Sequence, residues 1–171
     1  LYPNSKFVVT AKRKKTAELI VSEKIEKELM TLSPNLRREI KKISTSNNRV
    51  EVVFYNGSTI VVCPCNDDAR GQRATCILVD EFRQVDKTIV DSVFSPMLIQ
   101  RQVPYVMNEK YAHLREDPRE IYLSSCWYKS HWMWELVKDA ILGYYDNVSI
   151  CLSFDYAISV KHGIRSHKQM R

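Results

Sequence analysis

The stretch CILVDEFRQVD, residues 76–86, runs from four apolar residues directly into two acids, Asp80 and Glu81. A continuous apolar run of this length is typical of a strand buried on both faces of a parallel sheet. Ligands bind beyond the carboxyl ends of such strands, so both acids are expected at a ligand site. An Asp there offers the oxygen that Mg²⁺ prefers, and a Glu one residue later is directed differently and can orient or deprotonate a water. The pair therefore indicates the acidic half of an ATP-hydrolysing site, and the competing interpretation is an acidic strand end that caps a helix or pairs with an arginine.

The flanking sequence alternates strand and helix patterns. Asn56-Gly57 lies between two β-branched runs and predicts a hairpin before the 76–80 strand. Ser33-Pro34 predicts a helix start, followed by Leu36, Ile40 and Ile43 on one helical face. Other strands are expected at 6–11 and 121–127, and other helices at 14–30, 86–96 and 130–142. This alternation predicts an α/β domain with a mostly parallel sheet.

Composition bounds the class of protein. The chain has 171 residues, of which 44% are hydrophobic and 27% charged, enough for one domain with a real core. No run approaches the roughly 18 apolar residues that span a bilayer. Five scattered cysteines without zinc-site spacing suit a reducing, cytosolic compartment.

Net charge of +6 favours an acidic partner such as nucleic acid, though only mildly. Much of the positive charge lies in two short runs, at residues 12–15 and at Arg37, Arg38, Lys41 and Lys42. The ordinary interpretation of either run is a solvated helix face.

Residues 54–86, FYNGSTIVVCPCNDDARGQRATCILVDEFRQVD, resemble the ATPase domain of a tailed-phage or prophage terminase large subunit, the motor that packages DNA into a procapsid. That family has a hairpin, then an Arg-Gly pair, then a Walker B strand ending in Asp-Glu, and Arg70-Gly71 and Asp80-Glu81 fit this order. Its later coupling motif of small hydroxyl residues is matched by Ser124-Ser125, with Cys126 as a departure at the third position. The resemblance covers roughly residues 1–135.

The resemblance implies a P-loop NTPase-like fold of the additional-strand catalytic glutamate type, using ATP and Mg²⁺. Asp80 would hold Mg²⁺, and Glu81 would position the attacking water. Ser124 and Ser125 would sense the γ-phosphate, although plain strand-end packing is the alternative for both.

Arg70 would be an arginine finger that reaches a neighbouring subunit's γ-phosphate, with Arg73 as the competing candidate. For either arginine the structural alternative is a loop salt bridge with Asp67 or Asp68.

One required part is absent from the sequence. None of the four glycines is followed by Lys-Ser or Lys-Thr, so there is no phosphate-binding loop. The resemblance implies that this loop precedes Leu1 and that its strand lies beside the Walker B strand. Without that strand, backbone groups in the sheet would be unpaired, so either another chain or element fills the gap or the sequence is only part of what folds. We expect a partial ATPase core at 1–142, the start of a lid or linker at 143–171, no nuclease domain, and no activity from the fragment alone.

The resemblance implies double-stranded DNA, a small terminase subunit and a portal protein as partners, a homo-oligomeric ring during packaging, and the cytoplasm of a bacterial host as the location. Two alternatives remain open. A helicase-like motor shares the acidic strand and a later hydroxyl motif, but Phe82-Arg83 replaces the usual Ala-Asp or Ala-His. A non-catalytic DNA-binding or interaction module would have structural acids and basic runs that grip phosphate.

Overall fold

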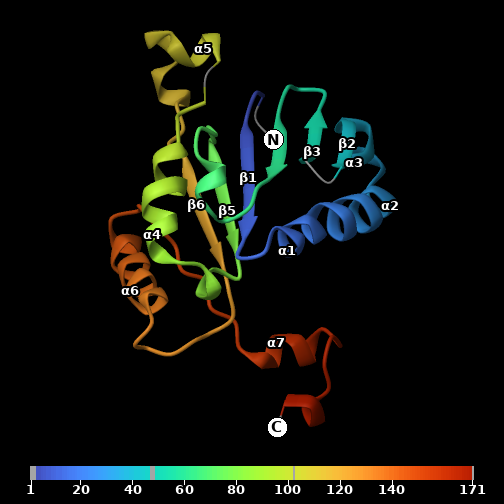
Figure 1. Ribbon diagram of the computed structural model, residues 1–171, viewed down its shortest axis with the longest axis vertical. Helices are drawn as coiled ribbons and strands as arrows, with labels where there is room; N and C mark the ends of the chain where they lie inside the picture. The colour runs from blue at the N-terminus through green and yellow to red at the C-terminus, as the bar shows by residue number, and fades with distance from the viewer. Residues whose placement is uncertain (1–2, 47–48, 102, 171) are drawn as a thin grey trace. The chain divides into compact units, whose positions relative to one another are not determined.

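A computed structural model describes residues 3–46, 49–101 and 103–170. The chain divides into two compact units, residues 1–126 and 127–171, and each is described by itself. Figure 1 shows their strands and helices in chain order.

The first unit is built on a six-stranded sheet with the order β2-β3-β4-β1-β5-β6. The strands are β1 (Lys6–Ala11), β2 (Ile40–Ser46), β3 (Arg49–Phe54), β4 (Thr59–Val62), β5 (Cys76–Asp80) and β6 (Arg119–Leu123). β4, β1, β5 and β6 run parallel to one another, whereas β2, β3 and β4 form an antiparallel meander. The predicted α/β class with a mostly parallel sheet is confirmed.

Helical segments connect the strands of the first unit. They are α1 (Lys14–Leu19), η1 (Ile20–Leu29), α2 (Met30–Leu32), α3 (Pro34–Glu39), η2 (Asp67–Ala69), η3 (Phe82–Gln84), α4 (Lys87–Ile89), η4 (Val90–Phe94), η5 (Ser95–Met97), α5 (Pro104–Met107) and η6 (Glu109–Leu114). The predicted helix from residue 14 is confirmed as the succession α1, η1 and α2, with the wider turns of a π-helix over η1.

One face of the sheet packs against α1 and η1, which cross it beside β1 and β3 in Figure 1. Ala17, Val21 and Ile25 recur at helical spacing and are buried there. From the sheet, this cluster takes Val9, Ala11, Ile40, Val50, Val52, Phe54 and Val62. Each buried Val or Ile contributes roughly 1.5–3 kcal/mol relative to an exposed one, so this face is a main source of the unit's stability.

The hairpin before β5 is confirmed. β3 and β4 pair in antiparallel register on either side of Asn56-Gly57. Gly57 has a φ of 81°, which a residue with a Cβ rarely adopts, and its N–H donates to the Phe54 carbonyl at 3.1 Å. The turn chemistry explains why this part of the fold could be predicted locally.

The helix that begins at Ser33 is shorter than predicted. Ser33 Oγ accepts from the Leu36 N–H at 3.4 Å, so the cap is confirmed, but α3 ends at Glu39. Ile40 and Ile43 lie on β2 instead, with Ile43 paired to Val52 of β3. Their β-branched side chains suit a strand, and pairing with a distant segment outweighs the local helical spacing.

The place expected for the missing strand, beside the 76–80 strand, is occupied by other strands of this chain. β5 is hydrogen-bonded along both sides, to β1 and to β6. Among the described strands β6 is instead an edge of the sheet, and Ile121 and Leu123 are 38% and 46% exposed on it. The parallel neighbours of β5 both come from this chain, so its backbone groups are satisfied without a further strand.

The second unit contains α6 (Trp132–Tyr145), α7 (Tyr156–Lys161) and η7 (His167–Met170). The predicted helix over 130–142 is confirmed as α6, and Met133 is its buried residue. Within the part of the chain that the structure describes, every helix is too short or too polar to cross a bilayer.

Candidate functional site

Four parallel strands end at one edge of the sheet, and this edge collects the predicted acids. Ala11, the last residue of β1, pairs with Asp80, and Asp80 in turn pairs with Leu123 of β6. The residues that follow Asp80 and Leu123 are Glu81 and Ser124, so the fold brings the acidic pair and the Ser-Ser pair to the same edge. This is the edge at which parallel α/β sheets bind ligands.

Asp80 is a partly buried carboxyl. Burial raises its pKa above the ordinary value of 3.8, the neighbouring Glu81 carboxylate raises it further, and a backbone hydrogen bond from Glu81 opposes both effects. A bound cation stabilises a carboxylate that is partly desolvated and lies beside a second acid. The end of β5 is therefore suited to binding a hard cation such as Mg²⁺.

Glu81 adopts an unusual backbone conformation. Its φ of 48° and ψ of 43° lie in the left-handed region, which is rare for residues other than Gly, Asn and Asp. Such a conformation costs about 1 kcal/mol or more and is held by surrounding structure, often at functional sites. The left-handed residue stands between β5, which ends at Asp80, and η3, which begins at Phe82.

Arg83 is a site residue that the sequence interpretation missed. Its Nε donates to Glu81 Oε2 at 3.0 Å, and the two side chains are 23% and 37% exposed. This contact restrains one carboxylate oxygen of Glu81. A cation two residues beyond a predicted catalytic acid is the signal that could have found it.

The Phe82 ring fixes the same turn to β6. Phe82 is buried, and its ring meets that of Tyr122 edge-to-face with centroids 5.4 Å apart. Tyr122 donates its hydroxyl to Glu120 Oε2 at 2.8 Å, and burial raises the Tyr122 pKa. The aromatic pair thus links the acidic turn to the strand that carries Ser124.

Ser124 and Ser125 are exposed where β6 ends. They lie outside the core, so the strand-end packing offered as an alternative does not bury them. Their hydroxyls are accessible to a ligand at this edge.

Arg70 and Arg73 lie on the loop between β4 and β5 and make other contacts. Arg70 Nε donates to Asp67 Oδ1 at 2.7 Å, and its Nη1 donates to the Ser92 carbonyl at 3.2 Å. Arg73 Nη1 donates to the Gln72 carbonyl at 3.3 Å. The loop salt bridge foreseen for Arg70 is therefore present, and no contact between either arginine and Asp80 or Glu81 is recorded in the described residues.

The cysteines near this edge are held as thiols. Burial raises the pKa of Cys63 to about 12, and burial also raises the pKa of Cys65. Thr10 donates its hydroxyl to the Cys63 carbonyl at 3.0 Å and so ties the ends of β1 and β4 together. These residues stabilise the edge and supply no nucleophile at neutral pH.

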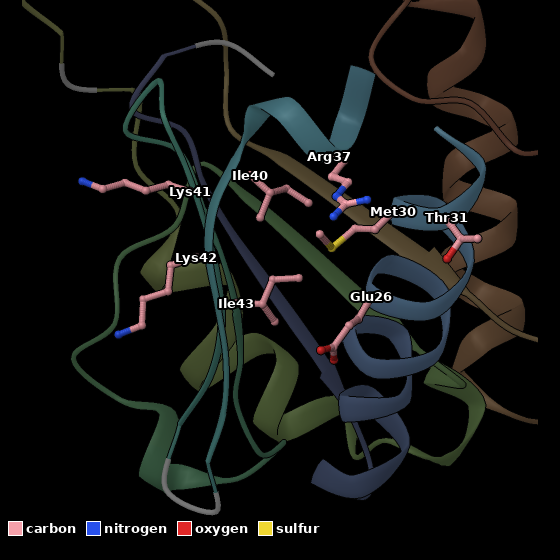
Figure 2. Close-up of a pocket in the computed structure, with 8 residues that line it drawn as sticks. All are labelled: Glu26, Met30, Thr31, Arg37, Ile40, Lys41, Lys42 and Ile43. Atoms are coloured by element: carbon pink, nitrogen blue, oxygen red, sulfur yellow. The ribbon is translucent and has the colours of Figure 1, made fainter. Parts of the chain in front are cut away.

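A groove of about 500 Å³ lies elsewhere, at the β2 edge of the sheet (Figure 2). Its walls come from η1, α2, α3 and β2, and its lining residues are Glu26, Met30, Thr31, Arg37, Ile40, Lys41, Lys42 and Ile43. Three strands separate β2 from β5, so this groove is not part of the acidic site.

The donor set at the acidic edge fits Mg²⁺ better than a transition metal. Among the described residues no cluster of three or more His, Cys, Asp or Glu is arranged to hold a metal ion. Mg²⁺ commonly uses one or two carboxylates, with waters and substrate phosphates completing its shell. Asp80 offers such a carboxylate, and Glu81 offers a second acid for a water.

Comparisons with known proteins bear on the fold. No family model matches the sequence, and no curated protein matches it. Among solved structures, the large terminase of a thermophilic bacteriophage in complex with ADP matches with a TM-score of 0.61 at 12% identity, over 98% of this chain and 36% of that one. A second crystal form of that terminase gives 0.60 at 11% identity, over 94% and 37%. The large terminase ATPase domain of Thermus phage P74-26 gives 0.50 at 14% identity, over 79% and 53%.

At these identities the matches establish the fold, which is that of phage large terminase ATPase domains, a P-loop NTPase-like α/β fold. The chain spans between about a third and a half of the length of the solved chains it matches. The activity, substrates and partners of a whole terminase are therefore proposals for this chain.

Proposed function

We propose that this chain is the metal-and-water half of the ATP-hydrolysing motor of a phage or prophage terminase large subunit, which drives DNA into the procapsid. The observation that carries the proposal is the Asp80-Glu81 pair at the carboxyl end of β5, in a sheet with the terminase ATPase fold. The bound ADP belongs to the matched terminase, and its presence there supports a nucleotide as the ligand of this edge.

The acids take different parts in this function. Asp80 holds Mg²⁺, which supplies charge neutralisation for the nucleotide phosphates when bound. Glu81 orients a water and accepts its proton; support comes from its place directly after the end of β5, beside Asp80. Arg83 leaves one oxygen of that carboxylate for the water.

Ser124 and Ser125 sense the γ-phosphate. Support comes from their exposure at the end of β6 and from the Phe82–Tyr122 ring contact, which couples β6 to the acidic turn. A shift of either element on phosphate release is transmitted to the other through this packed pair.

Arg70 serves as the arginine finger in a neighbouring subunit. In this role its hydrogen bonds to Asp67 and to the Ser92 carbonyl, which are the structural alternative, would have to break before the guanidinium could reach a neighbouring subunit's γ-phosphate. Arg73 remains the competing candidate. An arginine finger contributes about 10³–10⁵ to the rate of phosphoryl transfer.

The phosphate-binding loop and its strand come from another segment of the protein, because no glycine here precedes Lys-Ser or Lys-Thr. Residues 1–142 form a partial ATPase core and 143–171 begin a lid or linker. The motor works in the host cytoplasm as a homo-oligomeric ring with double-stranded DNA, a small terminase subunit and the portal protein.

The test uses Glu81→Gln in the complete protein, including the phosphate-binding loop. The amide keeps the size of the side chain but cannot accept a proton, so ATP hydrolysis should fall by roughly 10² or more. Nucleotide affinity should stay largely unchanged. Steady-state hydrolysis and equilibrium binding of a fluorescent ATP analogue measure the two effects.

Glu109→Gln is the matched control, because Glu109 is an exposed residue at the start of η6. It should hydrolyse ATP like the wild type. Hydrolysis by Glu81→Gln within a few-fold of the wild type would make Glu81 a structural acid and end the proposal.

A further inference from the structure

Most lysines on the helices are neutralised by an acid one turn away. The recorded pairs are Lys14–Glu18, Lys24–Glu28, Lys27–Glu23, Lys87–Asp91 and Lys138–Glu135. Their separations run from 2.5 Å for Lys87–Asp91 to 3.4 Å for Lys14–Glu18. These five lysines therefore present little net charge to a partner.

Four cations on one segment behave differently. Arg37, Arg38, Lys41 and Lys42, here called the α3–β2 cluster, are all exposed. Among the described residues no ion pair is recorded for any of them, and Glu39 is the one acid within the run. Within the described residues the cluster is therefore a concentration of positive charge without a recorded ion pair, and Glu26 is the one acid among the residues that line the groove beside it.

The position of the α3–β2 cluster differs from a solvated helix face. α3 ends at Glu39, so the arginines lie in its last turn and the lysines lie on the edge strand β2. Ile40 between them is buried, which anchors the segment and holds both pairs of cations at the surface. In Figure 2 the ends of Lys41 and Lys42 extend away from the neighbouring helix, whereas Arg37 lines the groove with Met30.

Lysines on an edge strand also discourage edge-to-edge aggregation. That role accounts for Lys41 and Lys42 but needs no arginines on the preceding helix. Two further exposed cations on the adjoining helix, within five residues of the lysines, point to a ligand that carries several negative charges.

We propose that the α3–β2 cluster binds the phosphate backbone of duplex DNA. Since none of these four cations has a recorded ion pair within the described residues, their contact with phosphates would release counterions without breaking such a pair. The choice of DNA among polyanions rests on the proposed function. The β2 edge is three strands from β5, so DNA contact and ATP hydrolysis occupy separate parts of the sheet.

The test compares two variants that each lose four positive charges. The first carries Arg37→Gln, Arg38→Gln, Lys41→Gln and Lys42→Gln. The matched control carries Lys24→Gln, Lys27→Gln, Lys87→Gln and Lys138→Gln, all at paired lysines. Fluorescence anisotropy with a labelled DNA duplex of mixed sequence, measured with the 171-residue chain over a series of salt concentrations, gives affinity and salt dependence.

The cluster variant should bind at least about tenfold more weakly at low salt, and its slope of log K against log salt should be shallower by about 3. The control should change that slope by less than about 1. Equal losses in both variants, unchanged binding by the cluster variant, or no binding by the wild type would overturn the proposal. Each failure is separable from that of the proposed function, which Glu81→Gln tests by hydrolysis.

Lysine acetylation of the unmutated chain covers the case in which a fourfold variant fails to fold. Bound DNA should protect Lys41 and Lys42 more than Lys24 and Lys27, as read by mass spectrometry. Equal protection of the two pairs would contradict the assignment.

Discussion

Asp80 and Asp86 stand on either side of one short turn, and the pKa values of their carboxyls are shifted in opposite directions. Asp86 Oδ1 accepts from the Thr88 N–H at 2.9 Å and from the Thr88 hydroxyl at 2.7 Å, and these bonds lower its pKa. Asp80 caps no helix, and burial raises its pKa. The difference separates a structural acid from a functional one. Asp86 stabilises the start of α4, whereas ionisation of Asp80 lowers the stability of the fold, as is typical of functional carboxylates.

The largest effect on stability is expected from removing the structural acid. Asp86→Ala removes the cap of α4 and should lower the Tm by a few degrees at pH 7. Because the folded pKa of Asp86 is below its ordinary value of 3.8, its contribution is present above that pH and is lost as the pH falls through the folded pKa. Thermal melts at pH 7 and near pH 3 measure both points, and a loss that persists unchanged at the lower pH would refute the capping account.

A smaller effect, this time a gain in stability, is expected from a substitution at Glu81 in the left-handed turn. Glu81→Gly relieves the left-handed backbone and should stabilise the chain by roughly 0.5–1 kcal/mol, after allowance for the greater freedom of glycine when unfolded. Glu81→Gln keeps the strain and is the control. Urea denaturation of both variants decides the matter: no gain for glycine over glutamine would mean that the turn is not strained.

The smallest effect is expected at Asp80. The pKa of Asp80 is raised in the folded state, so folding favours its protonated form. Ionised Asp80 therefore lowers the free energy of unfolding, and this loss develops as the pH rises toward the folded pKa. Asp80→Asn should therefore raise the Tm slightly at pH 7. The gain should vanish near pH 3, where wild-type Asp80 is protonated as well. A lower Tm for the variant at pH 7 would show that ionised Asp80 stabilises the fold. Asp80 would then be a structural acid, as Asp86 is.

Local signals predicted the parts of the fold that depend on neighbouring residues. The apolar run of β5 and the Asn56-Gly57 turn each specify their structure within a few residues. Ile40 and Ile43 were assigned to a helix because their spacing fits one, and only pairing with distant β3 makes them a strand. The order of strands is likewise non-local, which is why the neighbour of β5 was mispredicted.

The candidate site divides in the same way. The residues Asp80, Glu81, Ser124 and Ser125 could be named from motifs, and the parallel register brings their backbone positions to one edge. The left-handed turn at Glu81, its contact with Arg83 and the Phe82–Tyr122 pair arise from three-dimensional packing. No periodicity in the sequence encodes them.

The most direct test of the central claim sets the two aspartates against each other in catalysis. In the complete protein with its phosphate-binding loop, Asp80→Asn should lower steady-state Mg²⁺-dependent ATP hydrolysis by about 10² or more, because the metal loses its anionic ligand. Asp86→Asn should stay within a few-fold of the wild type, because asparagine also caps a helix. Equal rates for the two variants would contradict the account, since they would make Asp80 a structural acid like Asp86.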